Sequence, residues 1–412
     1  YLLACAEDRL WVCQGFAFSS KDWKRFAVEI AFTPDWRAAD FIAHDALAPL
    51  AARKLRSSLA WRDEARTADE FVDERLLRSL ASLSVAFSEE TKSRSALDPS
   101  VINALIARLL YFYFLVDRGF ITRERLDAWE LSGIGLGRTD EWQLEDARAL
   151  FKRLDEVFNG SVFPMPEAFS DAYDAQHLNL LRSVIRHGEK LDKSDVMQLS
   201  FFDYDFASIR TETLSAIYEM FLRNEDKDAG RNFGAFYTPP YLADYTLDRI
   251  EDQAPLGDGT RVLDPATGSG VFLVGAYRRI VEASLPDGTA QLPLARLHTL
   301  MNKNIFGVEL NPTACHVAAF SLYLTMLDYV DPKEAATDGL TANIQAADFF
   351  SDVGVDLRCD LVVGNPPWVQ LKRLNSPHAH AYLKRTNVAI GDKQAAELFF
   401  WKAYYDHLSD GG

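Results

Sequence analysis

Hydrophobic positions change their spacing twice along this chain of 412 residues. The first stretch, YLLACAEDRLWVCQGFAF, predicts two short strands around a turn at Glu7 and Asp8, and RFAVEIAF predicts a third. From about residue 39 apolar side chains recur three and four positions apart, which predicts mostly helices up to residue 230. After residue 231 short apolar runs alternate with helical segments, a pattern typical of βαβ units.

These patterns divide the chain into a small mixed α/β region at 1–95, a helical domain at 96–230 and an α/β domain at 231–412. Asp98 and Pro99 predict the start of a helix, as its cap and first residue, and Gly119 predicts its end. A loop is predicted at 159–169, and the polar stretch 222–234 is the predicted main boundary. Because the sequence starts without Met and stops abruptly, we expect a piece of a longer protein, with the α/β domain incomplete at its C-terminal end.

The composition, with 48% hydrophobic and 25% charged residues, is that of an ordinary globular protein. A net charge of -16 argues against a protein that simply coats nucleic acid. The four cysteines, Cys5, Cys13, Cys315 and Cys359, form no CxxC pair. This pattern is typical of a protein of the reducing cytoplasm, and it predicts no structural zinc or other metal site. The most apolar run, Val101 to Val116, is shorter than the roughly 20 residues of a membrane span. We therefore expect a buried helix there and no membrane partner.

The alternation after residue 231 predicts a parallel sheet with both faces covered. Its expected strands are TRVLDPA, NIFGVEL, NIQAADFF and CDLVVGNPPW, and the expected helices include GVFLVGAYRRIVEASL and PTACHVAAFSLYLTMLDYV. In such a sheet ligands bind at the carboxyl ends of the strands, near the point where strand order reverses.

A glycine-containing loop follows the first of these strands, in DPATGSGVF. Gly268 and Gly270 allow a tight turn close to a ligand, but Leu273 stands where a dinucleotide fingerprint has its third glycine, and no P-loop lysine follows. Asp264 repels phosphate and suits a cationic ligand such as S-adenosylmethionine, which carries a sulfonium and an ammonium. The alternative is an Asp-Pro turn that only caps a helix.

Acidic residues end the next two strands. Glu309 is placed to accept hydrogen bonds from ribose hydroxyls, and the alternative is a solvated glutamate. Asp348 is a candidate acceptor for an adenine amino group, and Phe349 for packing on the adenine ring. The alternative for this pair is a surface aspartate beside a core phenylalanine.

The fourth strand runs into Asn365-Pro366-Pro367-Trp368. The prolines fix φ and remove two backbone donors, so Asn365 and the carbonyl of Pro366 can accept both hydrogens of an exocyclic amine. Trp368 offers a flat face for stacking on a base. A proline-rich turn with a core tryptophan is the alternative.

In this order DPATGSG, FGVELN, ADFF and NPPW resemble the motifs of amino-methylating S-adenosylmethionine-dependent methyltransferases. NFGAFYTPP is similar to the YTP element of adenine-N6 DNA methyltransferases, especially the large type I, type IIG, BREX and DISARM enzymes, and LIARLLYFYFLVDRGFI resembles their helical domain. The resemblance implies an α/β Rossmann-like methyltransferase sheet, the catalytic domain 231–412, preceded by a mostly helical N-terminal domain. Trp368 departs from the commoner Tyr or Phe, and residues 1–95 lack a convincing nuclease motif.

The resemblance also implies the site residues. Those implied to bind S-adenosyl-L-methionine are Tyr237, Thr238, Pro239, Asp264, Ala266, Thr267, Gly268, Gly270, Phe272, Glu309, Asp348 and Phe349. Those implied to hold and methylate the target adenine are Asn365, Pro366, Pro367 and Trp368.

We therefore expect a site-specific enzyme that methylates the N6 amine of a flipped-out adenine in double-stranded DNA, within a restriction-modification or phage-defence system. Other subunits of such a complex are expected partners. Five basic residues and one acid between positions 369 and 393 favour DNA contact, through Lys372, Arg373, Lys384, Arg385 and Lys393. The alternative for this segment is a solvated loop of mixed charge. A methyltransferase for RNA or a protein amide, and a non-catalytic DNA-binding or assembly subunit, remain alternatives.

Overall fold

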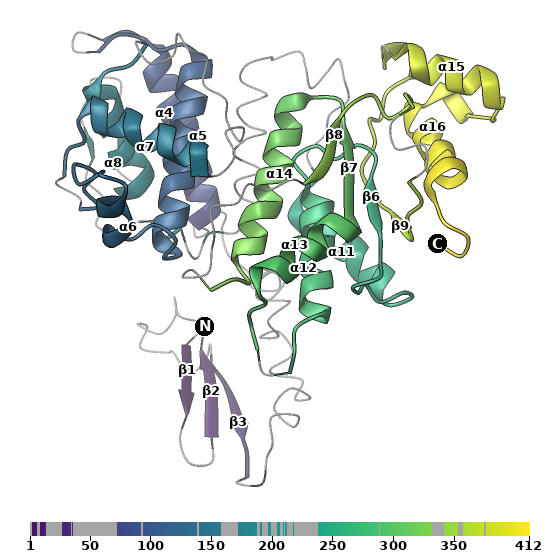
Figure 1. Cartoon of the computed structure of the whole chain (residues 1–412), viewed down its shortest axis with the longest axis horizontal. Coiled ribbons are helices and arrows are strands. Elements are labelled where there is room, and N and C mark those ends of the chain that lie inside the picture. The colour runs from purple at the N-terminus through teal and green to yellow at the C-terminus, as the bar shows by residue number, and fades with distance from the viewer. Residues whose placement is uncertain are drawn as a thin grey trace. The chain divides into compact units, whose positions relative to one another are not determined.

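A four-stranded parallel sheet organises the carboxy-terminal part of the chain in the computed structural model (Figure 1). The structure describes residues 2–5, 9–13, 27–33, 35, 72–91, 94–137, 140–157, 172–187, 190–191, 197–198, 204–206, 209, 211, 217, 238–287, 289–331, 342–352, 357–374 and 376–412. The chain divides into two units, Tyr1–Arg66 and Thr67–Gly412. The predicted loop at 159–169 and boundary at 222–234 lie outside the described residues.

The first unit contains an antiparallel three-stranded sheet of β1 (Leu2–Cys5), β2 (Arg9–Cys13) and β3 (Ala27–Ala31). The register pairs Leu2 with Cys13 and Arg9 with Ala31. The three strands expected from the alternating pattern at the start of the chain are therefore confirmed.

The second unit begins with a group of helices in which α5 packs against α4 and α8. Because α4 precedes residue 96, part of the predicted mixed region contributes to this group; the predicted domain limits themselves stay predictions. The elements of this part are α4 (Val72–Ser88), α5 (Pro99–Asp117), α6 (Arg123–Ala128), α7 (Leu144–Val157), α8 (Ala175–His187), β4 (Lys190–Leu191) and β5 (Met197–Gln198).

Helix α5 is the centre of the helical core. Its start follows the sequence expectation, since the Asp98 carboxylate accepts a hydrogen bond from the backbone N–H of Ser100 at 2.9 Å and Pro99 is the first helical residue. Gly119, with a φ of 77°, follows its end. By length and composition α5 is apolar enough to cross a membrane, yet 78% of its most apolar window is buried inside the protein. The predicted buried helix is confirmed.

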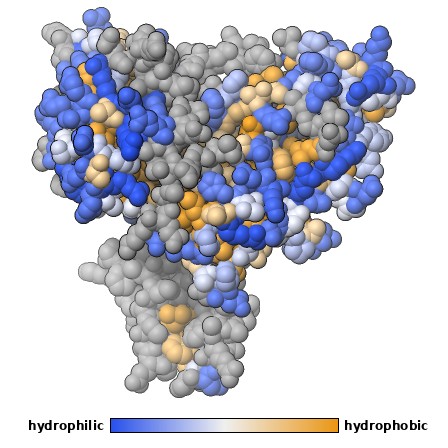
Figure 2. Space-filling view, in the orientation of Figure 1, coloured by the Kyte–Doolittle hydropathy of each residue, from blue (hydrophilic) through white to orange (hydrophobic). Residues whose placement is uncertain are grey.

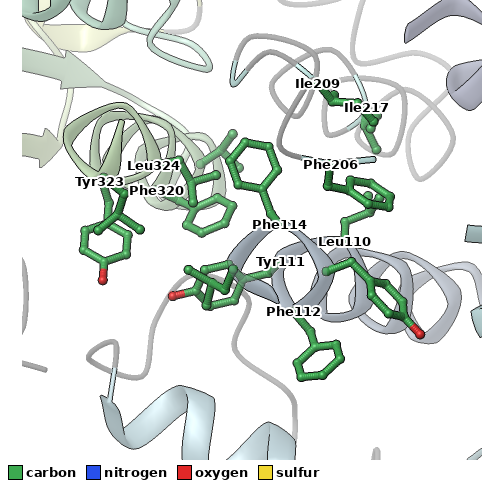
Figure 3. Packing of buried hydrophobic residues seen from close by; sticks show 14 of the residues in the cluster. Leu110, Tyr111, Phe112, Phe114, Phe206, Ile209, Ile217, Phe320, Tyr323 and Leu324 are labelled. Atoms are coloured by element: carbon green, nitrogen blue, oxygen red, sulfur yellow. The ribbon is translucent and has the colours of Figure 1, made fainter. Parts of the chain in front are cut away.

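Tyr111 and Phe114 of α5 lie on the side that faces α14 (Pro312–Leu327) of the α/β part (Figure 3). The rings of Tyr111 and Phe320 meet edge to face with centroids 4.6 Å apart. Arg118, at the end of α5, forms an ion pair with Asp328 at 2.5 Å and donates to the carbonyl of Leu324 at 3.3 Å. The helices and the sheet therefore share one hydrophobic core.

The parallel sheet has the strand order β8-β7-β6-β9. The first strand in sequence, β6, thus pairs with β7 on one side and with the last strand, β9, on the other, which is a doubly wound topology with its switch point between β6 and β9. The strands are β6 (Val262–Asp264), β7 (Ile305–Glu309), β8 (Asn343–Ala346) and β9 (Leu361–Val362), all within the predicted apolar runs.

Alternate residues of these strands enter two separate cores. Val262 and Ile305 belong to the large core that includes α12 and α14, whereas Leu263 and Val308 belong to a second core with Phe399 of α16. Both faces are therefore covered, as expected for an α/β sheet. The covering elements are α11 (Pro240–Glu251), α12 (Val271–Ala283), α13 (Leu294–Asn304), α15 (Pro377–Thr386), α16 (Ala395–Lys402) and the π-helix η7 (Ala403–His407).

The described surface is mostly hydrophilic on the face shown in Figure 2. Large apolar side chains that are exposed nevertheless gather on three helical elements of the α/β part. They are Tyr241, Leu242 and Tyr245 on α11, and Phe400, Tyr404 and Tyr405 on α16 and η7.

A buried arginine fastens α11 to α12. The guanidinium of Arg279 is only 4% exposed and binds Asp244 at 3.3 Å, Asp248 at 2.7 Å and Glu251 at 3.1 Å, all on α11. Because Thr238 and Pro239 directly precede α11, this ion-pair cluster also helps to set the position of these two residues.

Replacing this arginine tests the cluster. Arg279→Met leaves three partly buried carboxylates close together, so we expect a loss of about 3–5 kcal/mol in the free energy of unfolding. Arg249→Met on α11 breaks the exposed pair with Asp252 and should cost less than about 1 kcal/mol. Urea unfolding of both variants measures the difference, and equal effects would contradict the role of Arg279.

Candidate functional site

The loop between β6 and α12 turns sharply at two glycines. Gly268 has a φ of 53° and Gly270 a φ of 87°, both in the left-handed region. A Cβ on Gly270 would lie 2.9 Å from the Cβ of Ala318, so packing as well as conformation requires glycine there. A Cβ on Gly268 would meet no atom within 4 Å, so this residue borders open space.

Thr267 and Glu309 connect this loop to β7. The Thr267 hydroxyl donates to the carbonyl of Asp264 at 3.0 Å and to that of Val308 at 3.2 Å. The Glu309 carboxylate accepts from the backbone N–H of Gly268 at 2.8 Å and from that of Asn311 at 2.9 Å. Two strand ends and the glycine loop are thereby held as one unit.

Asp264 ends β6 and is buried, with 1% of its surface exposed. Its carboxylate accepts from the backbone N–H of Ala266 at 3.0 Å. Burial raises the pKa of Asp264 to about 8; the Ala266 N–H opposes the shift and the charge of Glu309 adds to it. A buried acid with this little compensation is a favourable place for a cationic ligand.

Gly364, after β9, lies directly against Asp264. A Cβ on Gly364 would stand 2.4 Å from Oδ1 of Asp264, a separation that no side chain tolerates. The backbone N–H of Val363 donates to the carbonyl of Leu263 at 2.9 Å, which continues the pairing of β9 with β6 up to this point. The end of β9 and the acid of β6 are therefore in contact at the switch point.

Asn365 follows at once and is hydrogen-bonded through both ends of its carboxamide. Its Nδ2 donates to the hydroxyl of Thr238 at 3.2 Å, and its Oδ1 accepts from Nε1 of Trp368 at 2.8 Å. Thr238 is 7% exposed and precedes Pro239, the N-cap of α11, whereas the indole of Trp368 is 62% exposed. Pro366 and Pro367 are half-buried. Tyr237 lies outside the described residues.

Asp348 and Phe349 follow β8 after Ala347; Asp348 is half-buried and Phe349 is buried. The Asp348 carboxylate accepts from the hydroxyl of Ser376 at 2.5 Å, and the Ser376 hydroxyl in turn caps α15 by accepting from the N–H of Ala379 at 2.9 Å. The ring of Phe349 is 3% exposed because Phe399 stacks on it, with centroids 5.3 Å apart. Asp348 thus connects β8 to α15, and the expected contacts of Asp348 and Phe349 with adenine stay predictions. Phe272, in the first turn of α12, is also buried.

The five basic residues between positions 369 and 393 are exposed and lie on three short elements. The segment from 369 to 393, expected to be a loop, contains α15, because Ser376 and Pro377 supply its cap and first residue. Gln370 pairs with Gln394 in an antiparallel bridge, which brings the first and last basic elements together. Lys372 and Arg373 lie on η5 (Leu371–Arg373), Lys384 and Arg385 in the last turn of α15, and Lys393 on η6 (Gly391–Lys393).

Two residues of the candidate site, Gly364 and Ser376, were not predicted from the sequence. Gly364 precedes Asn365 directly, yet only the folded sheet places it against Asp264. Ser376 is the partner of Asp348, and its neighbour Pro377 is a readable helix start. In both cases the contact joins segments far apart in the sequence.

Comparison with known proteins matches residues 210–412 to the family described as N-6 DNA Methylase. A type II methyltransferase, M.BstVI of Geobacillus stearothermophilus, is 30% identical over 186 residues, which are 44% of this chain and 32% of the relative. The methylase subunit of the type I restriction enzyme EcoEI of Escherichia coli is 26% identical over 207 residues, or 50% and 35%. The matched region thus spans about a third of the length of these relatives.

Among solved structures, a type I restriction-modification methyltransferase subunit from Streptococcus thermophilus is 16% identical and aligns with a TM-score of 0.44, over 83% of this chain and 73% of that chain. The resemblance to N6-adenine methyltransferases of restriction-modification type, expected from the motifs, is confirmed by the family match and the relatives.

The raised pKa of Asp264 has a consequence for stability. In an unfolded chain this carboxyl titrates near 4, so between roughly pH 4 and 8 the folded protein holds a proton that the unfolded chain has lost. The contribution of neutral Asp264 is complete below about pH 4 and is lost as the pH rises towards about 8. Asp264→Asn cannot ionise, so its stability relative to the wild type should grow from pH 5 to pH 8 by on the order of a few kcal/mol.

Urea unfolding at several pH values in the absence of ligands measures this difference. Asp410→Asn, at an exposed position, is the matched control and should follow the wild type at every pH. Parallel pH profiles for Asp264→Asn and the wild type would show that the Asp264 carboxyl is not held neutral.

Proposed function

We propose, from the match of residues 210–412 to the N-6 DNA methylase family, that this chain is the methyl-transferring part of an adenine-specific DNA methyltransferase of a restriction-modification or phage-defence system. One observation carries the proposal. The carboxamide of Asn365 is hydrogen-bonded to Thr238, and its neighbour Gly364 touches the buried carboxylate of Asp264, so the expected amine-binding and cofactor-binding groups lie side by side.

The residues around the glycine loop fit S-adenosyl-L-methionine. Asp264 is a buried carboxylate with a raised pKa, which a cationic ligand would stabilise in its ionised form, and Gly268 borders open space. When bound, this cofactor supplies an electrophilic methyl group on a positively charged sulfur. Thr238 and Pro239 would hold its methionine end and Glu309 its ribose hydroxyls. The other proposed binding residues are Tyr237, Ala266, Thr267, Gly270, Phe272, Asp348 and Phe349.

The target amine would be held by Asn365 and Pro366. Oδ1 of Asn365 and the carbonyl of Pro366 would accept the two hydrogens of the adenine N6 amine, which draws its lone pair out of conjugation with the ring. Trp368, exposed beside Asn365, would stack on the base, a contact worth roughly 1–3 kcal/mol. An adenine in duplex DNA has to leave the helix to reach these groups, at a cost of a few kcal/mol. Catalysis would then consist of positioning and electrostatics, with no covalent enzyme intermediate.

The exposed basic residues after the Asn-Pro-Pro-Trp loop support double-stranded DNA as the substrate. Five of them occupy η5, α15 and η6, in a chain whose net charge is -16. Phosphate contacts of this kind supply most of the sequence-independent affinity for DNA. Other subunits of a restriction or defence complex are proposed as further partners, and a cytoplasmic location follows from this role.

Removing the Asn365 carboxamide tests the proposal. Asn365→Ala in the full-length protein should lower methyl transfer from labelled S-adenosyl-L-methionine to duplex DNA by at least about a hundredfold, because the amine loses a pre-positioned acceptor. Cofactor affinity, measured by calorimetry, should change less than about twofold, since Asp264 and Glu309 are unaltered.

Asn302→Ala, which truncates an exposed asparagine on α13, is the control and should keep full activity. Near-normal transfer by Asn365→Ala would refute the role of Asn365. Transfer of label to RNA or to protein in place of DNA would refute the proposed substrate.

The basic residues of α15 allow a separate test. Lys384→Gln with Arg385→Gln should weaken binding to duplex DNA and reduce the slope of log affinity against log salt by about 2, since each lost phosphate contact removes about 1. The control pair is Lys152→Gln with Arg153→Gln on α7, two adjacent basic residues that pair with Glu156. Fluorescence anisotropy between 50 and 200 mM salt, as an approximate range, measures the slopes. Equal slopes for the α15 and α7 variants would exclude DNA contact by α15.

A further inference from the structure

Three side chains at the proposed base site form one hydrogen-bonded chain: Thr238, Asn365 and Trp368. The Nε1–Oδ1 distance between Trp368 and Asn365 is 2.8 Å, and the Nδ2–Oγ1 distance between Asn365 and Thr238 is 3.2 Å. Thr238 comes from the start of α11 and the other two follow β9, so the chain of bonds joins segments 127 residues apart. The commoner Tyr or Phe at position 368 could not contribute an indole N–H.

The two hydrogen-bond partners of the Asn365 carboxamide differ in whether they fix the orientation of the amide. A threonine hydroxyl can donate or accept, so Thr238 alone is satisfied by either orientation of the Asn365 amide. An indole N–H can only donate, so Trp368 is satisfied only when Oδ1 faces it. In the flipped orientation the Asn365 NH2 would oppose the indole N–H, donor against donor. Trp368 therefore decides which end of the amide is the oxygen end.

This orientation matters for the proposed reaction. A carbonyl oxygen has two lone pairs, and after accepting from Trp368 the Oδ1 of Asn365 keeps one for a second donor. An exocyclic amine is such a donor. A flipped amide would present its own N–H groups to the amine and would hold it poorly.

The backbone on both sides of Trp368 is held by its neighbours, which suits a residue that orients the Asn365 carboxamide. The carbonyl of Val369 accepts from the N–H of Ala395 at 2.8 Å, and Gln370 pairs with Gln394. On the other side, Gly364 rests against Asp264, and two prolines restrict the chain between Gly364 and Trp368. Since Trp368 is 62% exposed, core packing does not hold its indole, and the hydrogen bond to Asn365 is the clearest restraint on the ring.

We propose that Trp368 is a positioning residue for the Asn365 carboxamide, through its indole N–H, in addition to offering a stacking surface. This inference deepens the proposed function and rests on it for the identity of the amine. The bond itself is a property of the free protein. The effect of Trp368 on methyl transfer and its hydrogen bond to Asn365 in the free protein can therefore be tested independently.

Trp368→Phe is the central variant because it keeps an aromatic face and removes the N–H. In the full-length protein we expect kcat for DNA methylation to fall on the order of tenfold, with the KM values for DNA and cofactor within about twofold of the wild type. Trp368→Ala loses the ring as well and should also raise the KM for DNA. Trp401→Phe is the matched control, since it deletes an indole N–H that donates to the carbonyl of Ala389 at a distance of 3.2 Å and not to Asn365. This control variant should leave kcat unchanged. Wild-type kcat in Trp368→Phe would overturn the positioning role.

A thermodynamic cycle tests the bond without any activity. Trp368→Phe should lower the urea midpoint of the free protein when Asn365 is present and should have no effect in an Asn365→Ala background, because the acceptor is then already gone. Additive effects would show that the indole and the carboxamide are not coupled and would overturn the inference. If the wild type transfers no methyl group to DNA while the cycle is non-additive, the proposed function fails and the positioning of Asn365 stands.

Discussion

The parallel pairing of β6 with two partners is the constraint on which the rest of the site depends. Val262 lies opposite Ile305 of β7 on one side and opposite Leu361 of β9 on the other, so all three strands run in register and end at one edge. That register delivers Asp264, Glu309 and Asn365 to the same place from segments spread over a hundred residues of sequence. Strand order reverses beside β6, which is where a doubly wound sheet binds its ligands.

Hydrogen bonds and close packing hold the loops of the site to neighbouring strands. Thr267 and Glu309 fasten the glycine loop to β7, and Gly364 allows the last strand to touch Asp264. The cost of this arrangement is concentrated in Asp264, a buried acid whose pKa is raised to about 8. A protein that tolerates such a group without a bound cation gives up stability at neutral pH, a compromise common at functional sites.

Sequence patterns predicted the features that depend on residues close together in the chain. The cap at Asp98, the buried helix that follows it, the four strands and the glycine turn all depend on spacing within a few residues, and the structure has them. Helix α15 was not predicted: its segment was expected to be a loop, although Ser376 and Pro377 supply a readable cap and first residue. The bonds of Asn365 to Thr238, and of Asp348 to Ser376, depend on tertiary packing, which no periodicity reports. For the same reason the sequence offered Phe349 either as an adenine contact or as a core residue, and only the folded protein shows Phe399 as its stacking partner.

The proposed activity is methyl transfer to the N6 amine of adenine in DNA. The most direct measurement is to express the complete protein, with its neighbouring genes, in a host free of DNA methylation and to sequence the genomic DNA for modified bases. We expect methylation at the N6 position of adenine within one recurring sequence, absent from cells that carry the empty vector. Unmodified adenine, or methyl groups found on cytosine, RNA or protein, would contradict it.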